Sequence, residues 1–210
     1  CASRIIVKSG EMMRALWGPN RRKATVIANG VDMDLFSPMD KEEARLHLSW
    51  DLDKRYVLFF PGGGSLVKDP DLARDAFTYA SERAQRCELV LVENVPNEEL
   101  VWYYNAADAL LITSLHEGSN NSLKEAMCCN LPVVSVLCGD ARERLLGVDQ
   151  CRIIDERSYE AIGRALLDVI LADRRSDGRR FMADLSLEYV ARKIVEVYAS
   201  ALKDTGNAKK

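Results

Sequence analysis

The chain has 210 residues, 48% of them hydrophobic and 29% charged, a balance typical of a globular domain that buries its own core. A formal net charge of -3 argues against a broad nucleic-acid surface, and no apolar run of about 18 residues is present to span a membrane. The six cysteines form no CxxC pair and lack histidines at zinc spacing, so we expect free thiols in a cytoplasmic protein without metal or cofactor.

Short apolar runs alternate with amphipathic stretches along almost the whole chain. The expected strands are residues 5–8, 25–28, 56–61, 89–92, 109–113, 132–136 and 152–154. The expected helices are residues 11–17, 41–48, 71–86, 97–106, 122–129, 141–146, 158–172, 173–183 and 187–202. Apolar strands joined by helices predict an α/β fold with a doubly wound, Rossmann-like parallel sheet.

The start of the chain differs from the remainder. Residues 5–17 read as a single strand–helix unit, and Asn29-Gly30 marks a tight turn because both residues tolerate positive φ. We therefore predict a boundary near Arg22, with residues 1–22 left over from a preceding domain. Residues 23–203 would form the main domain, and residues 204–210 a flexible polar tail.

The first candidate ligand loop follows the strand at 56–61, because open α/β sheets bind ligands at the carboxyl ends of their strands. Gly62, Gly63 and Gly64 would let backbone N–H groups approach an anion closely, and Lys68 adds a positive charge before the next helix. The spacing matches neither a P-loop nor a dinucleotide fingerprint. An anion cradle and a flexible surface turn with a solvated lysine both fit this loop.

The second candidate loop follows the strand at 109–113 and leads into a helix. Small and capping residues stand where this helix begins: Gly118, Ser119, Asn120, Asn121 and Ser122. Free N–H groups of the first turn would form a second anion cradle. Glu117 precedes the turn and Glu125 lies inside the helix, so both carboxylates suit sugar hydroxyls, although exposed helical glutamates are equally common.

A known family shares this pattern. Residues 117–134 contain Glu117-Gly118, then Lys124-Glu125-Ala126-Met127 and Leu131-Pro132-Val133-Val134. This segment resembles the Glu-x7-Glu region of retaining GT-B glycosyltransferases, and more specifically the glycosyltransferase group 1 family. Residues 26–32, 103–108 and the last helix are similar too, so the resemblance covers about residues 1–203.

The resemblance implies that the chain is the C-terminal, donor-binding half of a GT-B enzyme. Such an enzyme moves a sugar from a nucleoside diphosphate to an acceptor hydroxyl, with retained configuration and usually without a metal. Glu117 would be the catalytic residue beside the sugar, and Glu125 would hold the ribose hydroxyls. Lys68 and the glycine loop would neutralise the diphosphate, the N–H groups of the second loop would meet the distal phosphate or sugar, and Val95 would face the base.

The resemblance also implies a partner domain. The acceptor-binding half is expected to precede Cys1, and any contact with the inner face of the membrane is expected through that half. The chain alone is then expected to bind a nucleotide without transferring a sugar. Gly63 stands where the family has an arginine, so two alternatives stay open: a nucleotide-sugar 2-epimerase-like GT-B enzyme and a non-catalytic nucleotide-binding subunit.

Overall fold

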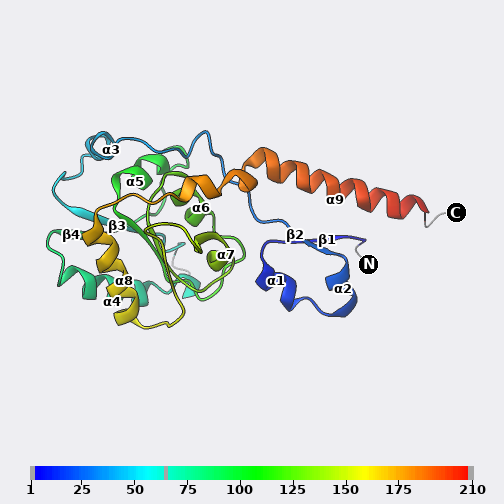
Figure 1. The fold of residues 1–210 in the computed structure, drawn as a ribbon, viewed down its shortest axis with the longest axis horizontal. Coiled ribbons are helices and arrows are strands. Elements are labelled where there is room, and N and C mark those ends of the chain that lie inside the picture. Colours follow the sequence, from blue (N-terminus) through cyan, green and yellow to red (C-terminus); the bar gives the residue numbers. More distant parts are fainter. Residues whose placement is uncertain (1–2, 64–65, 208–210) are drawn as a thin grey trace.

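A five-stranded parallel sheet forms the centre of the protein, in a computed structural model that describes residues 3–63 and 66–207. The strands lie in the order β4-β3-β5-β6-β7 (Figure 1). They are β3 (Arg55–Phe59), β4 (Cys87–Leu91), β5 (Ala109–Ile112), β6 (Val133–Val136) and β7 (Arg152–Ile154). All neighbouring pairs are parallel, which confirms the predicted α/β class and Rossmann-like sheet. The order reverses between β3 and β5, and ligands bind at such points in open sheets.

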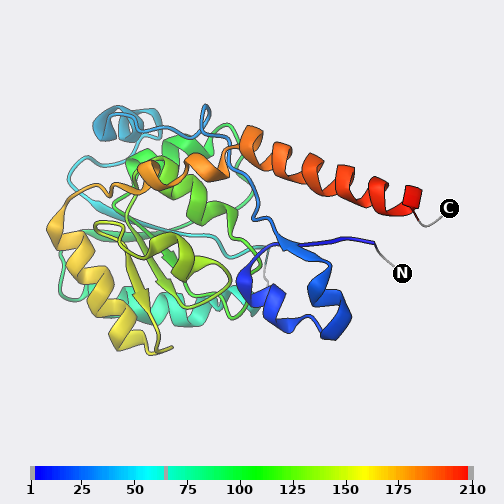
Figure 2. The same ribbon diagram turned by 45° about the vertical axis from the view of Figure 1, so that its right-hand side comes forward.

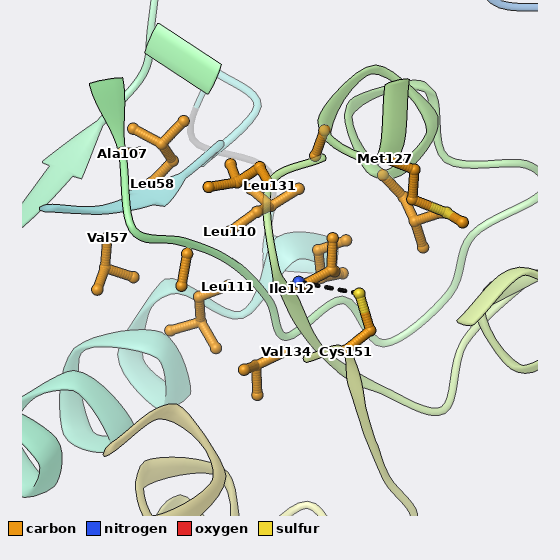
Figure 3. Packing of buried hydrophobic residues seen from close by; sticks show 14 of the residues in the cluster. Val57, Leu58, Ala107, Leu110, Leu111, Ile112, Met127, Leu131, Val134 and Cys151 are labelled. Carbon is orange, nitrogen blue, oxygen red and sulfur yellow. Dashed lines mark hydrogen bonds between the residues drawn. The ribbon is translucent and has the colours of Figure 1, made fainter. Parts of the chain in front are cut away.

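The inner strands are buried on both faces, as their uninterrupted apolar runs predict. Figure 3 shows Leu58 and Leu110 on one side of the sheet, with Val57, Leu111 and Val134 on the other. All five side chains are almost completely buried, so the sheet is the centre of one continuous hydrophobic core. The edge strands β4 and β7 are only partly buried.

Helices cover both faces of the sheet (Figures 1 and 2). They are α3 (Lys41–His47), α4 (Pro70–Ser81), α5 (Leu100–Ala106), α6 (Asn121–Cys128), α7 (Ala141–Leu145) and α8 (Tyr159–Ala172). α4 and α8 pack together on one face, and α5 and α6 lie on the other with α3 outside α5. Asp69, Asn120 and Ser158 cap α4, α6 and α8, each accepting a hydrogen bond from a backbone N–H of the first turn.

A small unit at the N-terminus lies beside this body (Figure 2). It contains β1 (Ile5–Val7), α1 (Gly10–Ala15), α2 (Gly18–Arg22) and β2 (Ala24–Val26). β2 pairs in parallel with β1 and not with the main sheet, so the expected strand at 25–28 belongs to this unit. The helix α2, with Pro19 in its first turn, has no counterpart among the expected helices. The domain division near Arg22 stays a prediction.

Residues 173–183 do not form the predicted helix. Asp173 has a left-handed backbone conformation, with φ of 46°, and this ends α8. The chain then runs without regular structure to two short 3-10 helices, η2 (Gly178–Phe181) and η3 (Ala183–Leu185).

Two arginines of this segment explain its conformation. Arg175 and Arg179 donate to backbone carbonyls at or near the C-terminal ends of helices α5 and α6, including Ala107 O at 2.8 Å and Cys129 O at 2.7 Å for Arg175. Arg179 donates to Cys128 O at 3.1 Å and also to Phe36 O at 2.6 Å. Terminal carbonyls of a helix need such donors. These tertiary hydrogen bonds outweigh the local preference of a charged segment for helix.

The last helix, α9 (Leu187–Asn207), extends away from the sheet on the same side as the N-terminal unit (Figures 1 and 2). It continues past residue 202, where the predicted helix ends, into the segment predicted as a flexible tail. Its exposed apolar side chains include Val195, Tyr198 and Leu202.

At the amino end of the sheet, a buried carboxylate accepts hydrogen bonds from several segments of the chain. Asp108 is 7% exposed and accepts hydrogen bonds from Lys41 Nζ at 2.5 Å and Arg45 Nη2 at 2.8 Å. It also accepts from Arg55 Nη1 at 3.2 Å and from the backbone N–H of Tyr56 at 2.7 Å. Since Arg45 is itself buried, loss of the carboxylate would leave a buried cation without its counter-ion.

We therefore expect Asp108→Ala to lower the free energy of unfolding by about 3–5 kcal/mol, measured by urea denaturation. Asp53→Ala is the matched control, because its side chain is 78% exposed in its ion pair with Arg86. That control should change the free energy by less than about 0.5 kcal/mol. Equal effects of the two substitutions would contradict a supporting role for Asp108.

Candidate functional site

The two predicted ligand loops meet at the carboxyl edge of the sheet. The loop after β3 leads through the 3-10 helix η1 (Leu66–Lys68) into α4, and the loop after β5 leads into α6. The backbone N–H of Leu115 donates to Val67 O at 2.7 Å, which joins the two loops directly.

Glu117 lies at the centre of this junction. Its Oε1 accepts hydrogen bonds from Lys68 Nζ at 2.5 Å, Ser114 Oγ at 2.8 Å and Asn120 Nδ2 at 3.2 Å. The side chains of Lys68 and Glu117 are 25% and 15% exposed to solvent, so a ligand can reach both. A space of about 10 Å³, with room for about one water molecule, adjoins Lys68 and is lined by Ser114, Asn120 and core residues such as Leu110. The structure thus brings together a cation and a carboxylate that were predicted from separate loops.

Glu125 is half-buried on α6 and contacts an aromatic side chain. Tyr104 Oη donates to Glu125 Oε2 at 2.7 Å, and the Tyr104 ring stacks on Phe60 with centroids 5.8 Å apart. Burial raises the pKa of Glu125 above its ordinary value, and the hydrogen bond from Tyr104 opposes this shift. A carboxylate that has lost part of its hydration gains more from hydroxyl donors of a ligand.

The loop from Gly118 to Ser122 is held by hydrogen bonds of its own. Asn120 Oδ1 accepts from Leu123 N at 3.2 Å and from Ser122 Oγ at 2.7 Å, so Asn120 caps α6. The backbone N–H of Asn120, expected to face a phosphate, donates to Asp140 Oδ1 at 3.3 Å. Asn121 Oδ1 accepts from Asn29 Nδ2 at 3.1 Å, which connects the segment at Asn29 to this loop. The tight turn with positive φ predicted at Asn29-Gly30 is wrong, because this segment has neither a turn nor a positive φ.

A buried ion pair beneath the loop was missed by the sequence analysis. Lys124 and Asp140 are 0% and 1% exposed, with Nζ and Oδ2 3.8 Å apart. Both contact Ser119 Oγ, which donates to Asp140 Oδ2 at 2.9 Å and accepts from Lys124 Nζ. Burial lowers the pKa of Lys124 to about 8, against the attraction of Asp140. The position of Asp140 after β6, at the same sheet edge, is a signal that could have pointed to it.

The remaining predicted residues lie around this centre. Gly62 and Gly63 are exposed, with left-handed φ of 67° and 65°, whereas Gly64 falls outside the described residues. Gly118 is half-buried. Val95, in the loop after β4, is half-buried and packs against the core. The described residues contain no group of three metal-ligating side chains.

Gly139 packs directly against the backbone of Glu117. A Cβ added at Gly139 would lie 2.8 Å from Glu117 Cβ and 2.9 Å from Glu117 O, at a left-handed φ of 53°. Gly147 also has a positive φ, of 81°, but a Cβ there meets no atom of the described residues within 4 Å. A side chain at Gly147 would therefore add backbone strain alone, whereas one at Gly139 would add both backbone strain and a steric clash with Glu117.

We predict that Gly147→Ala lowers the free energy of unfolding by about 1 kcal/mol through backbone strain alone. Gly139→Ala should lower it by about 1–3 kcal/mol more, because the loop carrying Glu117 has to move. Urea denaturation measures both values. Equal losses would show that Gly139 does not restrain Glu117.

The stability of the protein should depend on pH through Lys124. Because its pKa is about 8 in the folded protein and 10.5 ordinarily, the unfolded chain binds more protons between these values. The free energy of unfolding of the wild type, relative to Lys124→Met, should rise by an amount on the order of 3 kcal/mol from pH 8 to 10.5. A constant difference across this range would contradict a buried, titrating Lys124.

Comparisons with known proteins show the family of the chain. The family described as Glycosyl transferases group 1 matches residues 53–172, more than half of the chain. The chain is 26% identical to D-inositol 3-phosphate glycosyltransferase 1 of Catenulispora acidiphila, over 93% of this chain and 56% of the relative. It is 27% identical to the D-inositol 3-phosphate glycosyltransferase of Geodermatophilus obscurus, over 99% of this chain and 54% of the relative. The chain therefore spans about half the length of these curated relatives.

Solved structures share the fold. Sucrose-phosphate synthase from Thermosynechococcus elongatus superposes with a TM-score of 0.82 and 19% identity, over 97% of this chain and 59% of that one. Anabaena HepE, solved in complex with UDP and glucose, gives a TM-score of 0.72 and 18% identity, over 95% and 63%. In the part of the chain that the structure describes, no helix has the length and apolar character to cross a membrane. The chain belongs to the group 1 glycosyltransferases, enzymes with the GT-B fold.

Proposed function

We propose that this chain is the donor-binding domain of a retaining glycosyltransferase, which moves a sugar from a nucleoside diphosphate to an acceptor hydroxyl. The observation that carries the proposal is the contact between Lys68 and Glu117 at the carboxyl edge of the sheet. Membership of the group 1 family and the UDP bound to HepE support a nucleotide-sugar donor. Relatives named as glycosyltransferases favour transfer over the epimerase and non-catalytic alternatives.

Lys68 and Glu117 suit the two sides of the bond that breaks. The cation of Lys68 would stabilise the charge that develops on the departing diphosphate. Glu117 would accept hydrogen bonds from hydroxyls of the transferred sugar and orient it. Before the donor binds, the two side chains neutralise each other and stay near the position that the donor needs, with Ser114 and Asn120 holding the carboxylate.

In the proposed reaction the bond between the anomeric carbon and the diphosphate oxygen breaks. The acceptor oxygen forms a bond to the same face of the sugar, which retains the configuration. The departing phosphate takes the proton of the acceptor hydroxyl, so no base from this chain is needed for that step. Glu117 orients the sugar in this scheme and does not form a covalent bond to it.

Glu125 and the neighbouring loops would hold the nucleoside. The Glu125 carboxylate, fixed by Tyr104, would accept the ribose hydroxyls. Backbone N–H groups of Asn121 and Ser122, at the start of α6, and of the glycine loop would contact the phosphates or the sugar, whereas the N–H of Asn120 donates to Asp140. The loop containing Val95 follows β4 at the same sheet edge and would contact the base.

The acceptor would be bound by a partner domain. Curated relatives are about twice as long as this chain, which supports an additional acceptor-binding half preceding Cys1. We propose a cytoplasmic enzyme whose contact with the inner face of the membrane, where the acceptor requires it, runs through that half. No metal takes part in the proposed reaction.

Calorimetric titration of the chain with UDP, GDP and ADP tests donor binding. At least one of these should bind with a dissociation constant between about 1 μM and 1 mM. Lys68→Ala should weaken that binding about tenfold or more, and should affect the matching monophosphate less. Lys54→Ala is the control, because Lys54 pairs with Glu88 at the amino end of the sheet, away from the two ligand loops. The donor proposal fails if none of the three nucleotides binds at millimolar concentration.

Turnover by the full-length protein tests the role of Glu117. Glu117→Ala should lower kcat by about a hundredfold while donor affinity changes by less than about fivefold, because orientation of the sugar matters most in the transition state. Sugar transfer at saturating donor measures kcat, and calorimetry measures affinity. A kcat equal to that of the wild type would exclude Glu117 from the reaction.

A further inference from the structure

Arg157 lies in a third loop and donates hydrogen bonds to both loops of the proposed donor site. It lies between β7 and α8, and its Nη2 donates to Asp69 Oδ2 at 2.5 Å and to Thr113 O at 2.8 Å. Its Nη1 donates to Ser114 O at 3.1 Å. One guanidinium therefore contacts the residue after Lys68 and the two residues that follow β5. Its planar shape suits three acceptors that lie close together.

The turn that Arg157 holds has an unfavourable backbone conformation. Asp69 has a left-handed φ of 51°, which costs an L-residue free energy and persists only when the surroundings hold it. Its Oδ1 caps α4 by accepting from Leu72 N at 3.3 Å, while its Oδ2 faces Arg157. The hydroxyl of Thr113 donates to the carbonyls of Lys68 and Asp69, at 2.8 and 2.9 Å.

These contacts converge on Lys68. The Thr113 hydroxyl holds its backbone, Arg157 holds the next side chain, and Lys68 Nζ reaches Glu117. Ser114 connects Arg157 to Glu117, since its carbonyl accepts a hydrogen bond from Arg157 and its hydroxyl donates one to Glu117. The direction of the Lys68 side chain thus depends on the turn that Arg157 stabilises.

We propose that Arg157 is a positioning residue, which holds the turn at Asp69 so that Lys68 meets the diphosphate of the donor beside Glu117. The proposal rests on the proposed donor-binding function of Lys68. The alternative is that Arg157 contacts the diphosphate directly. It would then take over the role of the arginine that the family has at the position of Gly63. Positioning fits the geometry better, because both Nη atoms already donate to protein acceptors and Asp69 neutralises the charge.

Calorimetry on Arg157→Gln tests the proposal, with the nucleoside diphosphate that the wild type binds and with its monophosphate. The affinity for the diphosphate should fall about tenfold, because Lys68 no longer points to the terminal phosphate. The affinity for the monophosphate, which lacks that phosphate, should change less than about twofold. Arg164→Gln is the control, since Arg164 is exposed on α8 and its side chain donates to Glu160 O. It should leave both affinities unchanged.

Two further variants separate positioning from direct contact. In a Lys68→Ala background, Arg157→Gln should weaken diphosphate binding no further, because its effect passes through Lys68. Asp69→Asn keeps the helix cap but removes the anion facing Arg157, so it should lower diphosphate affinity as Arg157→Gln does. A guanidinium that contacts the diphosphate would be freed by Asp69→Asn, and affinity would be kept or raised.

The role of Arg157 is contradicted if Arg157→Gln leaves the diphosphate affinity unchanged. An equal loss for diphosphate and monophosphate, together with a lower thermal unfolding midpoint, would show a structural role alone and would also overturn it. If Arg157→Gln does not fold, Asp69→Asn decides between the outcomes by itself. A wild-type chain that binds no nucleoside diphosphate would overturn the donor site and the role of Arg157 together. If the wild type binds and Arg157→Gln binds equally well, only the role of Arg157 is overturned.

Discussion

Lys68 and Glu117 are 49 residues apart in the chain, and their side chains meet at 2.5 Å because β3 and β5 are neighbouring parallel strands. Parallel strands end at the same edge of a sheet, so each loop that follows a strand lies beside the others. The loop after β6 adds Asp140, and the segment after β7 adds Arg157. Removal of the strand pairing would separate every group of the proposed donor site. The core that buries these strands therefore determines the geometry of the site.

Charged groups gather at both ends of the sheet, but with different consequences. At the amino end, Asp108 is buried beneath three cations, so its hydrogen bonds serve the fold. At the carboxyl end, the pair of Lys68 and Glu117 stays partly exposed. The buried pair of Lys124 and Asp140 lies beneath it and holds the loop. A partly exposed ion pair is thus supported by groups that solvent does not reach, as precise positioning requires.

Local patterns predicted much of this arrangement. Each expected strand is present with ends within two residues. For the inner strands β3, β5 and β6 this follows from their uninterrupted apolar runs, which have to be buried on both faces. Lys68 and Glu117 could be proposed because they lie in loops that follow strands, and Glu125 because its spacing from Glu117 resembles that of a known family. The position of Asp140 after β6 could have been noticed, but the partners of Asp140 and of Arg157 could not be assigned, since the partners of a side chain depend on the tertiary fold. Residues 173–183 show the same limit, because contacts of Arg175 and Arg179 with distant carbonyls override a helical pattern.

The position of a bound diphosphate tests the account most directly. A crystal structure of the chain with the nucleoside diphosphate that it binds should show a terminal phosphate oxygen within hydrogen-bond distance of Lys68 Nζ, about 2.7–3.2 Å. The ribose hydroxyls should contact Glu125 in the same structure. A pocket of about 590 Å³ at the amino end, lined by both basic and acidic side chains such as Arg55, Arg174 and Asp173, is the alternative place for the ligand. A diphosphate bound there, with Lys68 still paired to Glu117, would contradict the proposed donor site.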